Sequence, residues 1–192
     1  MLKEPERKPE TDSFMWLFRT GEDGLAPIIL YHYTETRAKY NAVSFLEGFN
    51  GYLETDAYQG YNNLPGIKRC TCWAHIRRYF IDAVPKGKTY DYSNPAVQGT
   101  QFYSKLFEYE DRSKALKHTA EQRKAYRLEK ELPILEAFWS WLDKQKPNKG
   151  SRFHTAVNYA QNQKETSSPE TFNEDVVISP ATMIHTDFGT CF

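Results

Sequence analysis

The sequence has no long apolar run. No segment of the 192 residues approaches the roughly 20 consecutive apolar residues that a membrane-spanning helix needs. The opening stretch MLKEPERKPE carries charges where a signal peptide would need an apolar segment. We therefore expect a cytoplasmic protein that does not associate with membranes.

Cysteine is scarce, with Cys70, Cys72 and Cys191 as the three examples. An odd number of thiols excludes the paired framework of a small secreted protein, so we expect reduced cysteines. Cys70 and Cys72 would share one face of a strand, and His75 follows closely. A closed zinc site needs four ligands, however, and Cys191 is a poor fourth one, so we expect no zinc.

An excess of one charge is also absent, because 25 Lys and Arg residues balance 25 Asp and Glu residues. The whole molecule therefore offers no long-range field to attract DNA, and nucleic-acid binding would have to come from a local basic patch. The sequence has no metalloprotease helix motif, no glycine-rich phosphate loop and no serine-hydrolase elbow. Nucleotide hydrolysis and serine-hydrolase chemistry consequently have no support.

Hydrophobic residues make up 40% of the chain and aromatic residues 15%, which is enough for a folded core. Two β-branched and aromatic runs, 14–20 and 27–34, flank the turn-forming GEDG and predict a hairpin. A helix is expected over 35–48, with Gly48 at its end. Strands are expected over 51–55 and 67–73, and a helix over 74–84. The first half thus reads β-β-α-β-turn-β-α.

The second half is predicted to be helical from about residue 96 to residue 146. Thr119 and Gln122 fit a capping box, and Ser151 can cap a further helix. Trp139 is expected in the core and Trp141 at its periphery, although the pair could also stack on bases. The Lys and Glu pattern fits an exposed helical pair as well as a surface that contacts DNA or a partner protomer. After Thr166 no periodicity specifies a structure.

One acid, Asp56, stands at a position where catalytic residues are often found in α/β proteins. Asp56 follows the strand at 51–55, and α/β sheets present catalytic groups at the carboxyl ends of their strands. An Asp before Tyr, Gly and Asn residues also starts turns, so both interpretations stay open. His75, Arg77 and Arg78 begin the next helix, either as a phosphate-contacting patch or as a solvated basic face.

These stretches carry a family resemblance. The segments FLEGFNGYLETDAYQGYNNL and CWAHIRRYF resemble the central domain of the insertion-sequence 66 family of DDE transposases, and FMWLFRTG and AVNYAQNQKE resemble its hairpin and late helix. The similarity runs from about Leu2 to Thr166. It implies an α/β fold, an incomplete RNase H-like mixed sheet with flanking helices, plus a helical insertion. The implied divisions are a core at 1–94, the insertion at 95–148, the late helix at 149–166 and a divergent tail at 167–192.

The resemblance also implies a chemistry, in which three acids hold Mg²⁺ or Mn²⁺ ions that cleave and join DNA. Asp56 matches the second of these acids, as a catalytic and metal-binding residue. The first acid would precede Met1. The last acid belongs to a family motif that this sequence lacks, because none of the tail acids Glu170, Glu174 and Asp175 matches it. We therefore expect a truncated, frameshifted fragment that is inactive alone. Its implied partners are transposon-end DNA and a second copy or full-length transposase, with His75, Arg77 and Arg78 on the DNA.

Two other functions stay open. The chain could be a regulator that binds DNA or full-length transposase without catalysis. It could also be an independent metal-dependent nuclease in which Glu54 or an acid of the tail joins Asp56. If the first strand of the fold is missing, the hairpin has an open edge, which predicts marginal stability or association.

Overall fold

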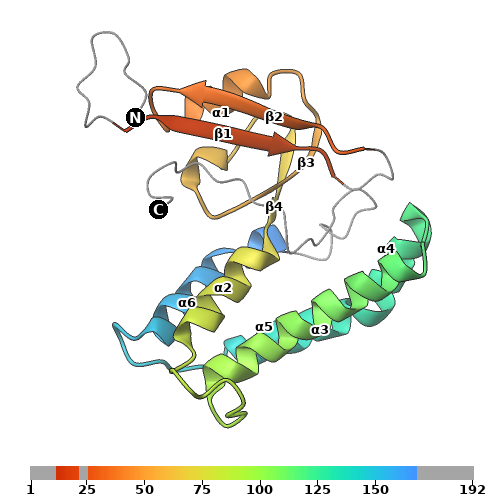
Figure 1. Ribbon diagram of the computed structural model, residues 1–192. Coiled ribbons are helices and arrows are strands. Elements are labelled where there is room, and N and C mark those ends of the chain that lie inside the picture. The colour runs from red at the N-terminus through yellow and green to blue at the C-terminus, as the bar shows by residue number, and fades with distance from the viewer. Residues whose placement is uncertain (1–11, 22–25, 168–192) are drawn as a thin grey trace.

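The computed structural model describes residues 12–21 and 26–167. These residues form a mixed α/β structure with four strands, six α-helices and two short 3₁₀ helices (Figure 1). In chain order the elements are β1 (Phe14–Arg19), β2 (Ile29–Thr34), α1 (Lys39–Phe45), β3 (Gly51–Thr55), η1 (Gln59–Tyr61), β4 (Ile67–Thr71), α2 (Trp73–Ala83), α3 (Pro95–Ala115), α4 (Ala120–Lys130), α5 (Leu132–Leu142), α6 (Arg152–Asn162) and η2 (Glu165–Ser167).

The predicted order of elements is confirmed. The capping box of Thr119 and Gln122 is formed at the start of α4, and the Ser151 hydroxyl accepts the His154 N–H at the start of α6. Helix α1 is shorter than the predicted 35–48, because the backbone is still extended at Ala38. At the other end Gly48 has a φ of 79°, a conformation that glycine adopts without strain.

The strands form two separate sheets. β1 and β2 pair as an antiparallel hairpin, with Phe14 opposite Thr34. β3 and β4 pair in parallel, with Gly51 opposite Ile67. Among the described residues no strand joins the two pairs, so the single mixed sheet that the sequence predicts is not formed there. Each pair is held together by its own hydrogen bonds.

Residues 12–21 and 26–71, which we call the strand region, have a small core of their own. Trp16 is fully buried and donates from its indole Nε1 to the Thr34 hydroxyl over 2.8 Å. Around it lie Phe18, Ala42, Tyr61 and Leu64. Strand β2 turns large apolar side chains to solvent, and Tyr31 is 64% exposed. The strand region is therefore covered on one side and open on the other.

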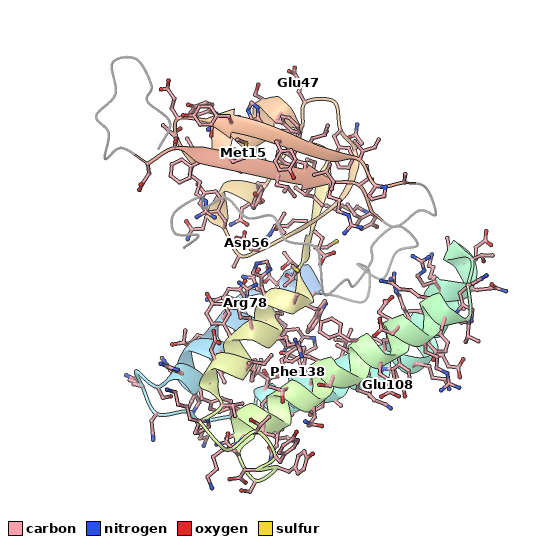
Figure 2. All side chains as sticks on the ribbon, in the orientation of Figure 1. Met15, Glu47, Asp56, Arg78, Glu108 and Phe138 are labelled. Carbon is pink, nitrogen blue, oxygen red and sulfur yellow. The ribbon has the colours of Figure 1, made fainter. Side chains whose placement is uncertain are left out.

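Residues 73–162, which we call the helical region, share a larger core. Helices α2, α3, α5 and α6 all contribute buried side chains, and Phe138 of α5 lies at its centre (Figure 2). The core runs across residues 94 and 148, where the sequence predicts divisions, and those divisions remain a prediction. The prediction that Trp141 is peripheral is confirmed, since it is partly buried and packs against the core beside Phe80, Phe102 and Phe153. Trp139, predicted in the core, is also only partly buried.

Charged residues are buried between α3 and α4. The Arg127 Nε donates to the Glu110 Oε1 over 2.6 Å, and both side chains are at most 1% exposed. Glu131, between α4 and α5, is fully buried as well. These helices are therefore not simply an exposed charged pair, one of the interpretations that their sequence allowed. None of the described helices is both long and apolar enough to span a bilayer.

Candidate functional site

Asp56 lies where the strand region meets the helical region, directly after β3 (Figure 2). Its Oδ1 accepts the Tyr58 backbone N–H over 2.9 Å, which is the local turn that the sequence allowed. The same carboxylate lines a cavity, and its side chain is 21% exposed. The two interpretations of Asp56 are thus compatible in geometry: one oxygen shapes the turn while the side chain stays accessible.

The cavity has a volume of about 460 Å³. One wall is a single face of α2, where four residues recur at positions i, i+3, i+4 and i+7. The strand-end turn, the segment before α1 and helix α6 supply the remaining walls. The lining residues are Arg37, Asp56, Ala57, Tyr58, His75, Arg78, Tyr79, Asp82 and Tyr159.

Two of the three predicted DNA-binding residues share this cavity with Asp56. His75 and Arg78 lie on the cavity face of α2, and the labelled Arg78 is seen below Asp56 in Figure 2. Arg77 points elsewhere, with its guanidinium 5.6 Å from the centre of the Phe107 ring of α3. Consecutive helical residues are about 100° apart around the axis, so neighbours in sequence face different surroundings.

Arg69 of β4, which sequence reasoning missed, fixes the backbone around Asp56. Its guanidinium donates to the Asp56 carbonyl over 2.9 Å and to the Thr55 hydroxyl over 2.9 Å. It also donates to the side chain of Asn62 over 2.6 Å and to that of Gln163, after α6, over 2.5 Å. Arg69 therefore ties the strand end to the residue that follows α6, 94 positions later in the chain. No local pattern marks such a contact.

Tyr159 of α6 forms the far wall and was not predicted either. Its ring stacks on Tyr79 of α2 with centroids 4.1 Å apart. A hydrogen bond with the backbone of Ala57 joins it to the turn after Asp56, and burial raises the pKa of its hydroxyl. The tyrosine pair gives this wall two aromatic rings that are fixed by packing.

Arg37, from the segment before α1, lies beside the Asp56 carboxylate. Its Nη2 lies 3.7 Å from the Asp56 Oδ2. Its guanidinium also lies over the Tyr58 ring, 4.0 Å from the centroid. The Tyr58 hydroxyl donates to the Arg37 carbonyl, so the same tyrosine holds the arginine at both backbone and side chain.

The other residues proposed for chemistry lie outside the cavity. Burial raises the pKa of Glu54 to about 8, and the carboxyl hydrogen-bonds with the Cys72 thiol. Burial also raises the pKa of Cys70 to about 12 and that of Cys72 further. Protonated buried thiols are poor metal ligands and poor nucleophiles. Cys191, Glu170, Glu174 and Asp175 lie outside the described residues.

The donor set of the cavity is too small for a divalent-ion pair. Across residues 12–21 and 26–167, no three His, Cys, Asp or Glu side chains converge as metal ligands. Asp56 and Asp82 are the two acids in the lining, and Asp56 faces a guanidinium. Hard Mg²⁺ ions require several oxygen ligands, so the described residues do not fit the two-ion site that the resemblance implies.

Comparisons with known proteins agree with the resemblance. Two proteins of Sinorhizobium fredii, described as "Uncharacterized protein y4hP" and "Uncharacterized protein y4qI", are each 27% identical to the chain, over 135 and 151 residues. These matches cover 62% and 72% of this chain but 24% and 27% of the relatives. The chain thus spans about a quarter of their length. No solved structure matches. The family described as "Transposase IS66 family" matches residues 1–176, and the chain belongs to that family.

Proposed function

We propose that the chain is part of a transposase machinery that cleaves and joins DNA at transposon ends, with Asp56 as one of its metal-binding carboxylates. The supporting observation is that Asp56 shares one cavity with the basic residues His75 and Arg78, at the end of a strand. Family membership supplies the role in transposition. The finer proposals are a DDE mechanism, an RNase H-like fold and contact with DNA.

The chemistry is the reason for proposing that the chain alone is inactive. Two divalent ions about 3.5–4 Å apart activate the attacking oxygen and stabilise the leaving oxygen of a phosphodiester. Such a pair needs several carboxylates, whereas the described residues bring no three ligands together. The relatives are far longer than this chain, so we propose that the companion acids belong to the rest of a complete family member.

The α2 wall suits a phosphate backbone. A guanidinium donates two parallel hydrogen bonds to phosphate oxygens, and an imidazole ring can donate one. Arg78 and His75 follow each other on the cavity face at helical spacing, which places both beside Asp56. Contacts of this kind position DNA without reading its sequence.

Binding of a transposon-end duplex across a salt series tests the DNA contact. We expect Arg78→Ala to weaken binding and to lower the slope of log K against log salt by about 1. Lys86→Ala is the matched control, because Lys86 is an exposed cation just beyond α2 and outside the cavity. Equal effects of the two substitutions, or no binding at low salt, would remove the proposed contact.

A second candidate is a regulator that binds DNA or full-length transposase without catalysis. It is favoured by the same small donor set around Asp56. Mixing the chain with the remainder of a longer family member separates the two candidates. Mg²⁺-dependent cleavage of the transposon end that Asp56→Asn abolishes supports the leading proposal. Inhibition of an active full-length transposase, with no cleavage in the mixture, supports the regulator.

The independent nuclease is the least supported candidate. Glu54, one of the acids that it could recruit, is buried against Cys72 and is not part of the cavity lining, and the acids of the tail lie outside the described residues. Cleavage by the chain alone that disappears in Asp56→Asn would revive it.

A further inference from the structure

We propose that the cavity binds one unpaired nucleotide of a DNA strand, with the base against the tyrosine pair of Tyr79 and Tyr159 and the phosphate at the arginines. This inference rests on the proposed DNA contact and goes beyond it, because the backbone of a paired duplex would use only the basic side chains. An aromatic wall, cations and acids surround one space, and that combination carries the inference.

The cavity has the size of a small-molecule site. Its volume of about 460 Å³ falls within the range of about 300–1,000 Å³ that is usual for pockets that hold small ligands. A nucleotide that has left the base stack can enter a pocket of this kind, whereas a base inside a duplex cannot. The size therefore favours a single nucleotide over a stretch of double helix.

The aromatic wall has no role in binding a phosphate backbone. Tyr79 and Tyr159 stack with centroids 4.1 Å apart, and a hydrogen bond with the backbone of Ala57 holds Tyr159 in place. Tyr79 is still 36% exposed, so packing does not cover the pair completely. Bases of any sequence stack on aromatic side chains, but in a duplex the neighbouring bases already cover their faces. The wall therefore suits a base outside the stack.

The charges of the lining match a whole nucleotide better than a bare anion. Arg37 and Arg78 are balanced by the carboxylates of Asp56 and Asp82, which line the same cavity. A phosphate alone would gain little from such a balanced lining. A nucleotide brings a phosphate for the guanidinium groups, and its unpaired base also brings amino or imino donors that carboxylates accept. Both signs of charge thus have a partner on the same ligand.

Fluorescence anisotropy of the intact chain with three labelled probes tests the inference. The first probe is a blunt transposon-end duplex, the second carries one added unpaired nucleotide at its 5′ or 3′ end, and the third carries an abasic sugar phosphate there instead. We expect the unpaired nucleotide to tighten binding about tenfold at one of the two ends, because stacking of one base on an aromatic ring has an effect of that size. The abasic probe should bind as the blunt duplex does.

Substitutions of tyrosine locate the effect. Tyr79→Leu removes the ring and should lose the tenfold gain, whereas Tyr79→Phe keeps the ring and should keep the gain. Tyr92→Leu is the matched control, because Tyr92 is 60% exposed and is not part of the cavity lining. We expect this control to keep the ratio of the wild type between the second probe and the blunt duplex.

The inference is overturned if the unpaired nucleotide gives no gain at either end, if the abasic probe keeps the gain, or if Tyr79→Leu and Tyr92→Leu give the same ratio. Binding of free dAMP without a gain for the second probe would assign the cavity to a free nucleotide and would also overturn it. The abasic comparison uses the wild-type chain, so it decides the matter even if Tyr79→Leu does not fold by circular dichroism.

The outcome for the proposed function is read from the blunt duplex. Duplex binding that depends on Arg78, without a gain for the unpaired nucleotide, removes this inference and leaves the proposed DNA contact standing. Absence of binding by all three probes removes both.

Discussion

The two regions of the chain differ in the size of their cores and in how closely their buried or partly buried ion pairs are packed. The helical region has one continuous aromatic core from four helices, and its buried arginine and glutamate are in close contact. The strand region has two two-stranded sheets, a small core and a looser arginine–aspartate pair. The cavity takes one wall from α2 in the helical region and another from the turn after β3 and the segment before α1 in the strand region. Local stability is expected to differ in the same sense.

The largest expected effect breaks the helical core. Phe138→Ala removes a fully buried ring that contacts the aromatic rings of Trp73, Phe80 and Tyr103. We expect a loss of about 3–5 kcal/mol in the free energy of unfolding, measured by urea denaturation. Phe18→Ala in the smaller core of the strand region should cost less. A larger loss for Phe18 would reverse the comparison.

A smaller loss is expected where the two regions are joined. Arg69→Met keeps an apolar stem but removes the hydrogen bonds to Thr55, Asn62, Asp56 and Gln163. We expect a loss of about 2–3 kcal/mol, because hydrogen bonds of a charged group contribute about 1.5–3 kcal/mol. Lys68→Ala, an exposed neighbour on β4, is the control. Equal unfolding free energies for the two variants would contradict a joining role.

The third effect depends on pH and belongs to the helical region. Burial, together with Glu110, raises the pKa of Glu131 from 4.5 to about 8, with Arg127 opposing the shift. The stability from this protonated carboxyl is complete below pH 4.5 and is lost as the pH rises to about 8. Glu131→Gln does not titrate, so its stability relative to the wild type should rise by about 1–3 kcal/mol between pH 5 and 9.

Glu54 of β3 also faces this cluster and shifts in the same direction, so the variant should keep part of the pH dependence. Urea denaturation of both proteins at matched pH values measures the difference. Parallel curves across that range would show that Glu131 ionises as an ordinary exposed acid does.

The smallest effect is expected on the open side of the strand region. Tyr31 on β2 is 64% exposed, so Tyr31→Lys removes little buried area. We expect the free energy of unfolding to change by no more than about 0.5 kcal/mol. A loss of several kcal/mol in the same denaturation experiment would mean that β2 is covered in solution.

Local patterns predicted the elements well, and the site only in part. The helix caps at Thr119 and Ser151 and the position of Asp56 at a strand end follow from neighbours in sequence. His75, Arg77 and Arg78 were predicted as one group, of which His75 and Arg78 face the cavity and Arg77 lies against Phe107. Arg37 and Tyr159 were missed, because their roles come from contacts that the fold brings together over long separations.

Sequence patterns also failed to predict which charged residues are buried. Glu110 and Arg127 stand in a segment rich in exposed Lys and Glu, and nothing in their spacing distinguishes them from surface residues. Their burial depends on how α3 and α4 pack, which a linear pattern does not record. The separation of the described strands into two sheets was likewise not evident from the strand patterns.

The bond between Arg69 and Gln163 has a consequence for synthesis of the chain on the ribosome. Asp56 and its turn emerge early, but Gln163, which accepts a hydrogen bond from the arginine that fixes their backbone, emerges about a hundred positions later. Contacts between such distant positions form slowly, since a long loop must close first. Nascent chains should therefore acquire a complete pocket only after residue 163 has left the ribosome, which delays any capture of nucleic acid at this site.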